Sequence, residues 1–303
     1  MSLIAINHHY YRNNSTGQGI YPLSAKELAR RVSFIGKYWS FATEDDVISF
    51  CGDELSDDKN VCVLTFDDGL KEQIKAVHDL NSLGIKAICF VSTAPIIDGV
   101  MLDVHKLHMI RSEQSDEEIA KDLHRKFNMF DYSFDDELLT IQYRYDTLIS
   151  RKVKYYLNFV MDKDIRDDWV SDVFNKKFGS EKNACEKLYM NADDIRFLAK
   201  NQVLGTHSHH HFPLATLSNS DTEKEIRNSI DILEDISKNR VRGISYPYGG
   251  KSAVSEDLYS IAQNCGLEYG FTMERGINKS CGNDSLSLKR IDTNDYIEWC
   301  GRG

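Results

Sequence analysis

Basic residues, proline and long hydrophobic runs are all scarce in this sequence. The chain of 303 residues carries 37 Lys and Arg against 47 Asp and Glu, which gives a formal net charge of −10. That balance argues against a nucleic-acid partner or an anionic membrane surface, because binding to either requires basic patches. No segment approaches the ~20 apolar residues of a membrane-spanning helix, so we expect no membrane insertion. The 41% of hydrophobic residues predicts a globular protein with a sizeable core.

Cysteine pairs are also missing. The seven cysteines are an odd number, and no two of them form a C-x-x-C motif. This pattern disfavours a structural zinc site or a disulfide framework and is typical of reduced thiols in a cytosolic protein. The first nine residues show neither a charged segment nor a long apolar segment of the kind that signal peptides have. We therefore expect a cytoplasmic location.

Apolar runs of strand length alternate with amphipathic segments, which predicts an α/β protein with a parallel sheet. At the start, strands are expected at residues 3–7, 61–66 and 85–92, and helices at 24–39 and 70–83. After residue 190 the alternation resumes, with helices expected at 191–201, 221–236 and 255–265 and strands at 203–206, 244–246, 269–272 and 287–291. Together these elements predict one domain over residues 1–303.

The middle of the chain differs from both ends. From about residue 104 to residue 187 the sequence is dense in charged residues, has helical periodicity and lacks a clear strand run. We interpret it as a helical insertion in the single domain. Its charged runs are expected to be solvated helix faces.

Four residues that suit metal chemistry follow two of the expected strands. Asp67 and Asp68 come directly after the run 61–66, and His207 and His211 follow a later apolar run. A spacing of four puts two histidines on one face of a helical turn or of a tight loop. Because functional residues of parallel α/β proteins lie at the carboxyl ends of strands, we expect these four side chains to converge.

This set would suffice for metal-assisted hydrolysis. Asp68, His207 and His211 would supply three protein ligands and leave a position open, as catalytic zinc sites require. Asp67 could then take a proton from water, whose pKa falls to ~7 on zinc. The alternative for the acidic pair is a helix-start turn, because Asp is a favoured N-cap residue.

Two further segments have both a functional and a structural interpretation. His209 and His210 are expected to face solvent, although a histidine tract that binds metal is the alternative. Tyr248 stands between Pro247 and Gly249, and this context could bring the Tyr248 backbone N–H close to a ligand. An ordinary Pro-Gly loop is the alternative there.

Three segments together resemble the polysaccharide deacetylases, carbohydrate esterase family four. They are Thr65-Phe66-Asp67-Asp68-Gly69, His207-Ser208-x-x-His211 and Tyr246-Pro247-Tyr248-Gly249. The resemblance extends from Asn7 to about Ile291, the helical insertion excepted. It implies a distorted, incomplete (β/α) barrel, TIM-like with about seven strands. It also implies metal-dependent removal of an acyl group, usually N-acetyl, from an amino sugar.

The resemblance assigns roles residue by residue. It implies that Asp67 is the general base and that Asp68, His207 and His211 are the metal ligands. It makes Ser208 a residue that orders the loop by hydrogen bonding. It makes the Tyr248 backbone N–H, next to Pro247, the donor to the oxyanion.

The sequence departs from the family pattern at two points. Ser245 stands where the third motif commonly has an arginine that supports the base, and Arg290 is the candidate to replace that arginine. The Leu-x-His segment that often carries the general acid near the C-terminus is also missing. However, Ile6-Asn7-His8-His9-Tyr10 and the segment 19–24 resemble a rearranged subgroup that acts on poly-N-acetylglucosamine. In that subgroup the acid histidine comes from the N-terminal strand, and His9 matches its position better than His8.

The expected function is therefore a metal-dependent hydrolase that removes an N-acetyl group from an amino sugar in a glycan or glycan precursor. Zn²⁺ is the expected cofactor, and a saccharide is the expected partner. One alternative is a deacylase of an O-acetyl, formyl or non-sugar amide substrate. Another is a degenerate member that binds glycan without catalysis.

Overall fold

The structure, a computed structural model, describes residues 2–13, 22–52, 60–279 and 285–297. These residues form two compact units. The described residues of 2–13, 22–100 and 184–297 form the first, which we call the barrel unit. Residues 101–183 form the second, which we call the helical unit. A single catalytic domain over 1–303 with an insertion at about 104–187 stays a prediction.

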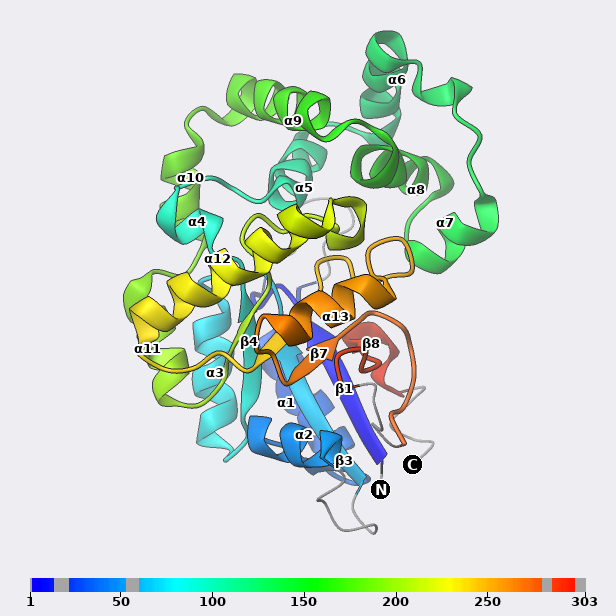
Figure 1. Cartoon of the computed structure of the whole chain (residues 1–303). Coiled ribbons are helices and arrows are strands. Elements are labelled where there is room, and N and C mark those ends of the chain that lie inside the picture. The colour runs from blue at the N-terminus through cyan, green and yellow to red at the C-terminus, as the bar shows by residue number, and fades with distance from the viewer. Residues whose placement is uncertain (1, 14–21, 53–59, 280–284, 298–303) are drawn as a thin grey trace. The chain divides into compact units, whose positions relative to one another are not determined.

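The barrel unit is built on one eight-stranded sheet in which every pairing is parallel (Figure 1). The strands follow the order β7-β6-β5-β4-β3-β1-β8, and β2 pairs with β3 beside this path. They are β1 (Ser2–His8), β2 (Ser40–Phe41), β3 (Asn60–Phe66), β4 (Ala87–Val91), β5 (Leu204–Thr206), β6 (Gly243–Ser245), β7 (Tyr269–Phe271) and β8 (Ile291–Asp292). The sheet curls into an incomplete barrel, which confirms the predicted fold class.

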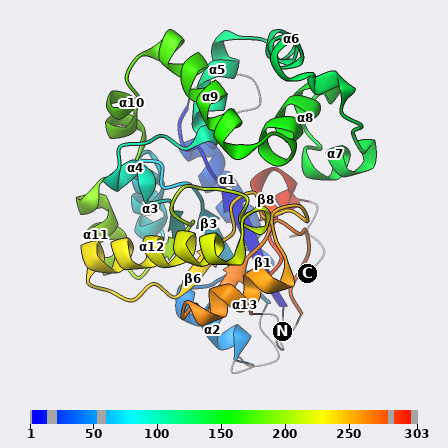
Figure 2. The same ribbon diagram turned by 45° about the horizontal axis from the view of Figure 1, so that its top comes forward.

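Most helices of the barrel unit cover the outside of the sheet, and one packs against the core inside the barrel. They are α1 (Ala25–Ile35), α2 (Glu44–Cys51), α3 (Gln73–Ser82), α4 (Ala94–Ile97), α11 (Ala192–Lys200), α12 (Asn219–Ser237) and α13 (Glu256–Asn264). Figure 2 shows α11, α12 and α13 side by side, and these helices also contact one another in sequence order. Two helices begin where the sequence predicts: Ser24 caps α1, and Asn191 forms a capping box with Asp194 at α11.

Side chains of the two long strands alternate between two cores. Ile4 and Ile6 of β1 belong to the core under the helices, together with Leu64 and Phe66 of β3. Leu3, Ala5, Val61 and Val63 belong to a second core on the other face of the sheet, inside the barrel. Because strand side chains alternate with a period of two, Asn7, Thr65 and Asp67 continue the inner set. The inner face therefore turns polar where the strands end.

The register brings the carboxyl ends of the central strands to one edge. His8 pairs with Phe66, Phe66 with Cys89, and Val91 with Thr206. The residues that follow these positions, His9, Asp67 and His207, consequently leave the sheet side by side. The convergence that the sequence predicts at the strand ends is thus a direct result of the register.

The helical unit contains no strand among its described residues. Its helices are α5 (Asp103–Glu113), α6 (Asp116–Phe127), α7 (Asp136–Gln142), α8 (Leu148–Tyr155) and α9 (Lys163–Phe178), with the short helices η1 (Met129–Asp131) and η2 (Tyr156–Val160), and α10 (Glu181–Leu188) begins in it. A buried ion pair between Arg111 and Asp116, 2.6 Å from Nε to Oδ1, joins α5 to α6. Trp169 of α9 packs in the core and donates from Nε1 to Asp122 at 2.9 Å.

Several elements differ from the sequence prediction. Strand β2 and helix α2 were not predicted, and α2 contributes Val47 and Phe50 to the core inside the barrel. Helix α3 begins at Gln73 and not at 70, because Leu70 forms a bridge with Tyr189. The last strand is only Ile291–Asp292, since Leu288 pairs with β7 in an isolated bridge.

No described helix is both long and apolar enough to cross a lipid bilayer. Cys62, Cys89 and Cys185 are buried, whereas Cys281, Cys300 and the part 19–21 of the segment 19–24 lie outside the described residues.

Candidate active site

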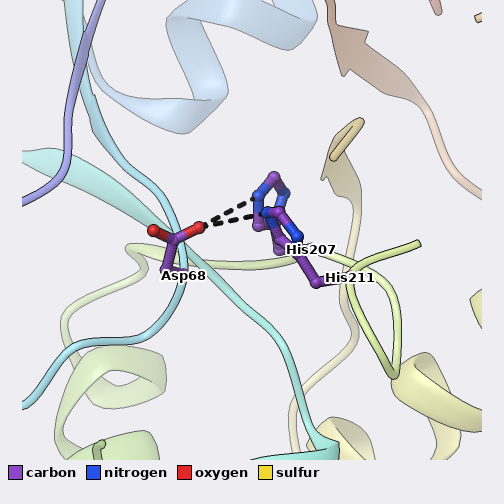
Figure 3. Close-up of side chains that lie close together, drawn as sticks. All are labelled: Asp68, His207 and His211. Atoms are coloured by element: carbon purple, nitrogen blue, oxygen red, sulfur yellow. Dashed lines mark ion pairs between the residues drawn. The ribbon is translucent and has the colours of Figure 1, made fainter. Parts of the chain in front are cut away.

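Asp68, His207 and His211 converge at the carboxyl edge of the sheet (Figure 3). Asp68 Oδ1 lies 3.4 Å from Nε2 of His207 and 3.4 Å from Nε2 of His211. One ligand atom from each residue lies within 4.8 Å of the others, and all three side chains are buried. Two imidazole nitrogens and a carboxylate oxygen at such separations can hold one divalent cation.

Two of the three candidate ligands, and two residues near them, stand on backbone that is costly to form. Asp68, Ser208, His211 and Tyr248 have φ between 61° and 80°, and they are four of the seven non-glycine residues with positive φ in the described part of the chain. Such conformations cost of order 1–3 kcal/mol each and concentrate at functional sites. The turns after β3, β5 and β6 are therefore shaped by the site and not by local preference.

Hydrogen bonds fix how the two histidines face. The Nδ1–H of His207 donates to the Ser245 carbonyl oxygen at 2.6 Å, so Nε2, which faces Asp68, is the nitrogen available to a cation. The His211 backbone N–H donates to Ser208 Oγ at 3.1 Å, the loop-ordering contact that the resemblance implies for Ser208. Metal-binding histidines are commonly oriented by such a partner on the second ring nitrogen.

Arg290 binds the carboxylate of Asp67 through both terminal nitrogens of its guanidinium group. Nη1 donates to Oδ1 at 2.9 Å and Nη2 donates to Oδ2 at 2.7 Å, and both side chains are buried. Burial alone would raise the pKa of Asp67, but the charge and hydrogen bonds of Arg290 outweigh it and hold that pKa below its usual value. The carboxylate is thereby kept ionised and fixed in orientation.

Ser245 connects Asp67 to the candidate metal ligands. Its hydroxyl accepts from Arg290 Nη2 at 2.8 Å and donates to Asp67 Oδ2 at 3.1 Å, while its carbonyl holds His207. The sequence singled out this position only for the missing arginine. In the structure, Ser245 and Arg290 together surround the carboxylate that an arginine from the third motif would otherwise hold.

Three other residues that support the site were not predicted. Arg290 Nη1 also donates to Asn7 Oδ1 and to Thr65 Oγ1, both at 3.2 Å. Gln73 Nε2 donates to the carbonyl oxygens of Asp67, at 2.6 Å, and of His9, at 2.8 Å. Strand alternation places Asn7 and Thr65 on the inner face of the sheet. That the two residues are neighbours follows only from the pairing register.

The two N-terminal histidines lie in different surroundings. His8 is buried, its ring centroid lies 5.0 Å from that of Phe66, and its Nδ1–H donates to the Thr65 carbonyl at 3.1 Å. Burial lowers the pKa of His8 to about 3, so its ring is neutral near pH 7. His9 is half-buried, and its main chain is tied through Gln73 to that of Asp67.

Tyr248 occupies the centre of a tight turn. The Gly249 N–H donates to the Pro247 carbonyl at 2.7 Å, which closes a three-residue turn around Tyr248 with its φ of 63°. The Tyr248 ring lies 5.0 Å from that of His211. A Cβ on Gly249 would come within 2.7 Å of the Met273 nitrogen, so this position requires glycine. The structure thus brings all nine predicted site residues to this edge of the barrel unit. They are His9, Asp67, Asp68, His207, Ser208, His211, Pro247, Tyr248 and Arg290.

One expectation about this loop is wrong. His209 does not face solvent, because its side chain is turned inward, with Nδ1 2.8 Å from Thr93 Oγ1. Its backbone carbonyl also accepts from the Ala94 N–H at 3.0 Å, and these contacts hold it against the start of α4. His210 is only half-buried.

Comparison with known proteins gives a family match and several structural likenesses. The model of the family "Polysaccharide deacetylase" matches residues 132–270. The Streptococcus pyogenes deacetylase PplD, solved in complex with acetate, is 15% identical with a TM-score of 0.59, over 96% of this chain and 92% of that one. IcaB from Ammonifex degensii is 12% identical with a TM-score of 0.61, over 99% and 96%. A de-N-acetylase from Aggregatibacter actinomycetemcomitans is 11% identical with a TM-score of 0.59, over 98% and 99%.

The structural likenesses show a shared fold at these identities. No curated protein matches the sequence. The resemblance to the polysaccharide deacetylases that the motifs indicate is confirmed by the family match together with these folds.

Proposed function

We propose that this chain, a relative of the polysaccharide deacetylases, is a metal-dependent hydrolase that removes an N-acetyl group from an amino sugar in a glycan or glycan precursor. The observation that carries the proposal is the placement of the Asp68, His207 and His211 set beside the Asp67–Arg290 pair. The printed names of the structural relatives, a deacetylase with acetate and a de-N-acetylase, support acetyl as the acyl group. A cytoplasmic location, which the cysteine pattern favours, would make a soluble precursor the substrate.

The donor set fits one Zn²⁺ ion. Asp68 would be held as a carboxylate, and His207 would offer Nε2 because Ser245 engages its other nitrogen. When bound, such an ion supplies Lewis acidity and lowers the pKa of water. Two imidazoles and one carboxylate also suit cobalt, nickel or iron, so metal content is part of the test.

Asp67 is the proposed general base. The attacking water must lose a proton as its oxygen bonds to the amide carbonyl carbon, and Asp67 would accept that proton. Arg290 makes Asp67 a weaker base but keeps it unprotonated at neutral pH and aimed in one direction. The expected products are acetate and a free amine on the sugar.

Two further groups complete the proposal. The backbone N–H of Tyr248 would donate to the oxygen that gains charge in the tetrahedral intermediate, a contribution worth several kcal/mol when preorganised. His9 would give a proton to the leaving nitrogen, since an amine anion is a very poor leaving group. Its link to Asp67 through Gln73 supports this assignment over His8.

The test is acetate release from N-acetylglucosamine oligomers and from soluble N-acetyl sugar conjugates. We expect activity in the metal-loaded protein, loss with a chelator, and recovery when zinc is returned. Asp67→Asn should abolish release while metal content stays at the wild-type value. Full activity after verified metal removal, or in Asp67→Asn, would contradict the mechanism. A parallel panel of O-acetyl, formyl and non-sugar amide donors identifies the acyl group.

A further inference from the structure

We propose that the chain carries a second divalent-metal site, formed by Asp98, His209 and His210, in addition to the Asp68 set. One ligand atom from each of these three residues lies within 4.8 Å of the other two. Asp98 follows directly after α4, and the two histidines lie in the loop after β5. All three belong to the barrel unit.

His209 is oriented as a ligand of this site. Its Nε2 lies 3.1 Å from Asp98 Oδ2, and its Nδ1 lies 2.8 Å from Thr93 Oγ1. Without a metal ion, Nε2–H can donate to Asp98; with one, the Thr93 hydroxyl can accept from Nδ1–H, which leaves the Nε2 lone pair for the ion. An imidazole fixed through one nitrogen while the other faces a carboxylate is the arrangement that metal-binding histidines show.

His210 is oriented from the opposite side. Glu225 of α12 accepts from His210 Nδ1–H at 2.6 Å and from the His210 backbone N–H at 2.8 Å. The pairing with Glu225 selects the tautomer whose Nε2 can coordinate. Phe212 stacks on the His210 ring with centroids 5.1 Å apart and planes 15° apart, and this contact also restricts the ring.

The chemistry of the donors defines the ion. Two imidazoles and one carboxylate favour zinc, copper, nickel or cobalt over magnesium and calcium, which prefer oxygen ligands. Asp98 is 43% exposed in its side chain, whereas the side chain of Asp68 is 5% exposed. We therefore assign the second site as the weaker and faster-exchanging of the two. Because His209 and His210 lie between His207 and His211, occupancy of either site should change affinity at the other.

The competing explanation is that the Asp98–His209 contact is only an ion pair. To separate the two, metal-free full-length protein is titrated with Zn²⁺ by calorimetry, and bound metal is counted by elemental analysis after dialysis. Mg²⁺ serves as the control ion. Wild type should bind two Zn²⁺ ions per chain, one more tightly than the other, and should show no comparable binding of Mg²⁺.

Variants assign the weaker site. Asp98→Asn and His210→Gln should each weaken it by at least about tenfold, the size of effect seen even for outer partners of a metal ligand. Asp68→Asn should remove the tight site and keep the weak one. Asp235→Asn removes one exposed carboxylate that pairs with Lys238 and should change neither. Circular dichroism checks that each variant is folded.

Three results would overturn the proposal. The first is a single Zn²⁺ per chain in wild type at millimolar zinc. The second is a weak site that survives both Asp98→Asn and His210→Gln. The third is loss of the weak site in His108→Gln, because His105 and His108 form a separate histidine pair in the helical unit, with ring centroids 6.0 Å apart.

Discussion

Arg290 comes from the segment before the last strand and yet contacts residues of β1, of β6 and of the turn after β3. It is 1% exposed, which is rare for an arginine without a specific partner. Its two hydrogen bonds to Asp67 make it a positioning residue for the proposed base. Removing it would leave a buried carboxylate without its counter-charge, a loss that typically costs several kcal/mol.

We predict that Arg290→Gln raises the pKa of Asp67 and so moves the acidic limb of the kcat/KM profile to higher pH. The sign follows because Arg290 lowers that pKa in the wild type. At pH 7 the activity should fall by at least about 100-fold, since a general base contributes ~10²–10⁴. Arg196→Gln, which breaks an exposed contact with Asp193, is the control. An unshifted acidic limb in an active Arg290→Gln protein would show that Arg290 does not set this pKa.

Ser245 offers a milder change at the same place. Ser245→Ala removes the hydroxyl between Arg290 and Asp67 but keeps the backbone carbonyl that holds His207. We predict a loss of kcat/KM of about tenfold, the equivalent of one buried hydrogen bond. Zinc content should stay at the wild-type value, as measured by elemental analysis. Loss of zinc together with activity would mean that Ser245 acts through the ligands and not through Asp67.

The two neighbouring histidines should differ sharply in effect. We predict that His9→Gln lowers kcat by ~10²–10⁴, the range for a lost general acid, with metal content unchanged. His8→Gln should lower kcat far less, because a ring with a pKa of about 3 is not in its imidazolium form near neutral pH and cannot act as a general acid. Single-turnover kinetics on an acetylated substrate measure both. Equal losses would argue for a structural role of this strand end.

At the scale of elements, the turn between β3 and α3 sets the geometry of the site. Gly69 has a φ of +72° in this turn, and a Cβ there would come within 2.7 Å of Val91 Cγ1. Gly84 has nearly the same φ, +73°, but nothing lies within 4 Å of an added Cβ. Comparing substitutions at Gly69 and Gly84 therefore separates the cost of the backbone conformation from the cost of the steric contact.

We predict that Gly84→Ala destabilises the protein by about 1 kcal/mol, the cost of a left-handed alanine. Gly69→Ala should cost more, because it adds an overpacked contact that typically costs 1–3 kcal/mol. Urea unfolding measures both. If the two variants unfold at the same urea concentration, then β4 yields to the added methyl group and the turn is softer than the structure indicates.

The sequence was most informative where function depends on neighbours along the chain. Asp67, Asp68, His207 and His211 could be predicted because each follows an apolar strand and parallel strands end at one edge. Ser245, Asn7 and Thr65 could not, since their roles depend on which inner-face positions meet across the register. Strand β2 was missed because two residues show no periodicity, and helix α2 was missed because its 8 residues give only a short helical pattern. The burial of His209 depends on Thr93, 116 residues away.

At the scale of the whole molecule, the proposed ligands all come from the barrel unit, and none comes from the helical unit. A bound ion stabilises only those structures that hold it. We predict that adding zinc to the metal-free protein slows hydrogen exchange at residues 66–70 and 204–211 by more than tenfold. Residues 101–183 should change little. Mass spectrometry of peptic fragments measures this, and equal protection in both units would show that zinc stabilises the chain as a whole.

The alternation in β1 has a consequence for how the chain tolerates changes in length. Leu3 and Ala5 line the barrel, and Asn7 meets Arg290 there, while Ile4 and Ile6 lie under the helices. Deleting one residue within this strand would exchange the two sets and bring His8 into the place of Asn7. Deleting two would restore the faces. Insertions or deletions of odd size in the strand that precedes the proposed acid are therefore expected to erase the site even where the sheet survives, whereas changes of even size keep both faces.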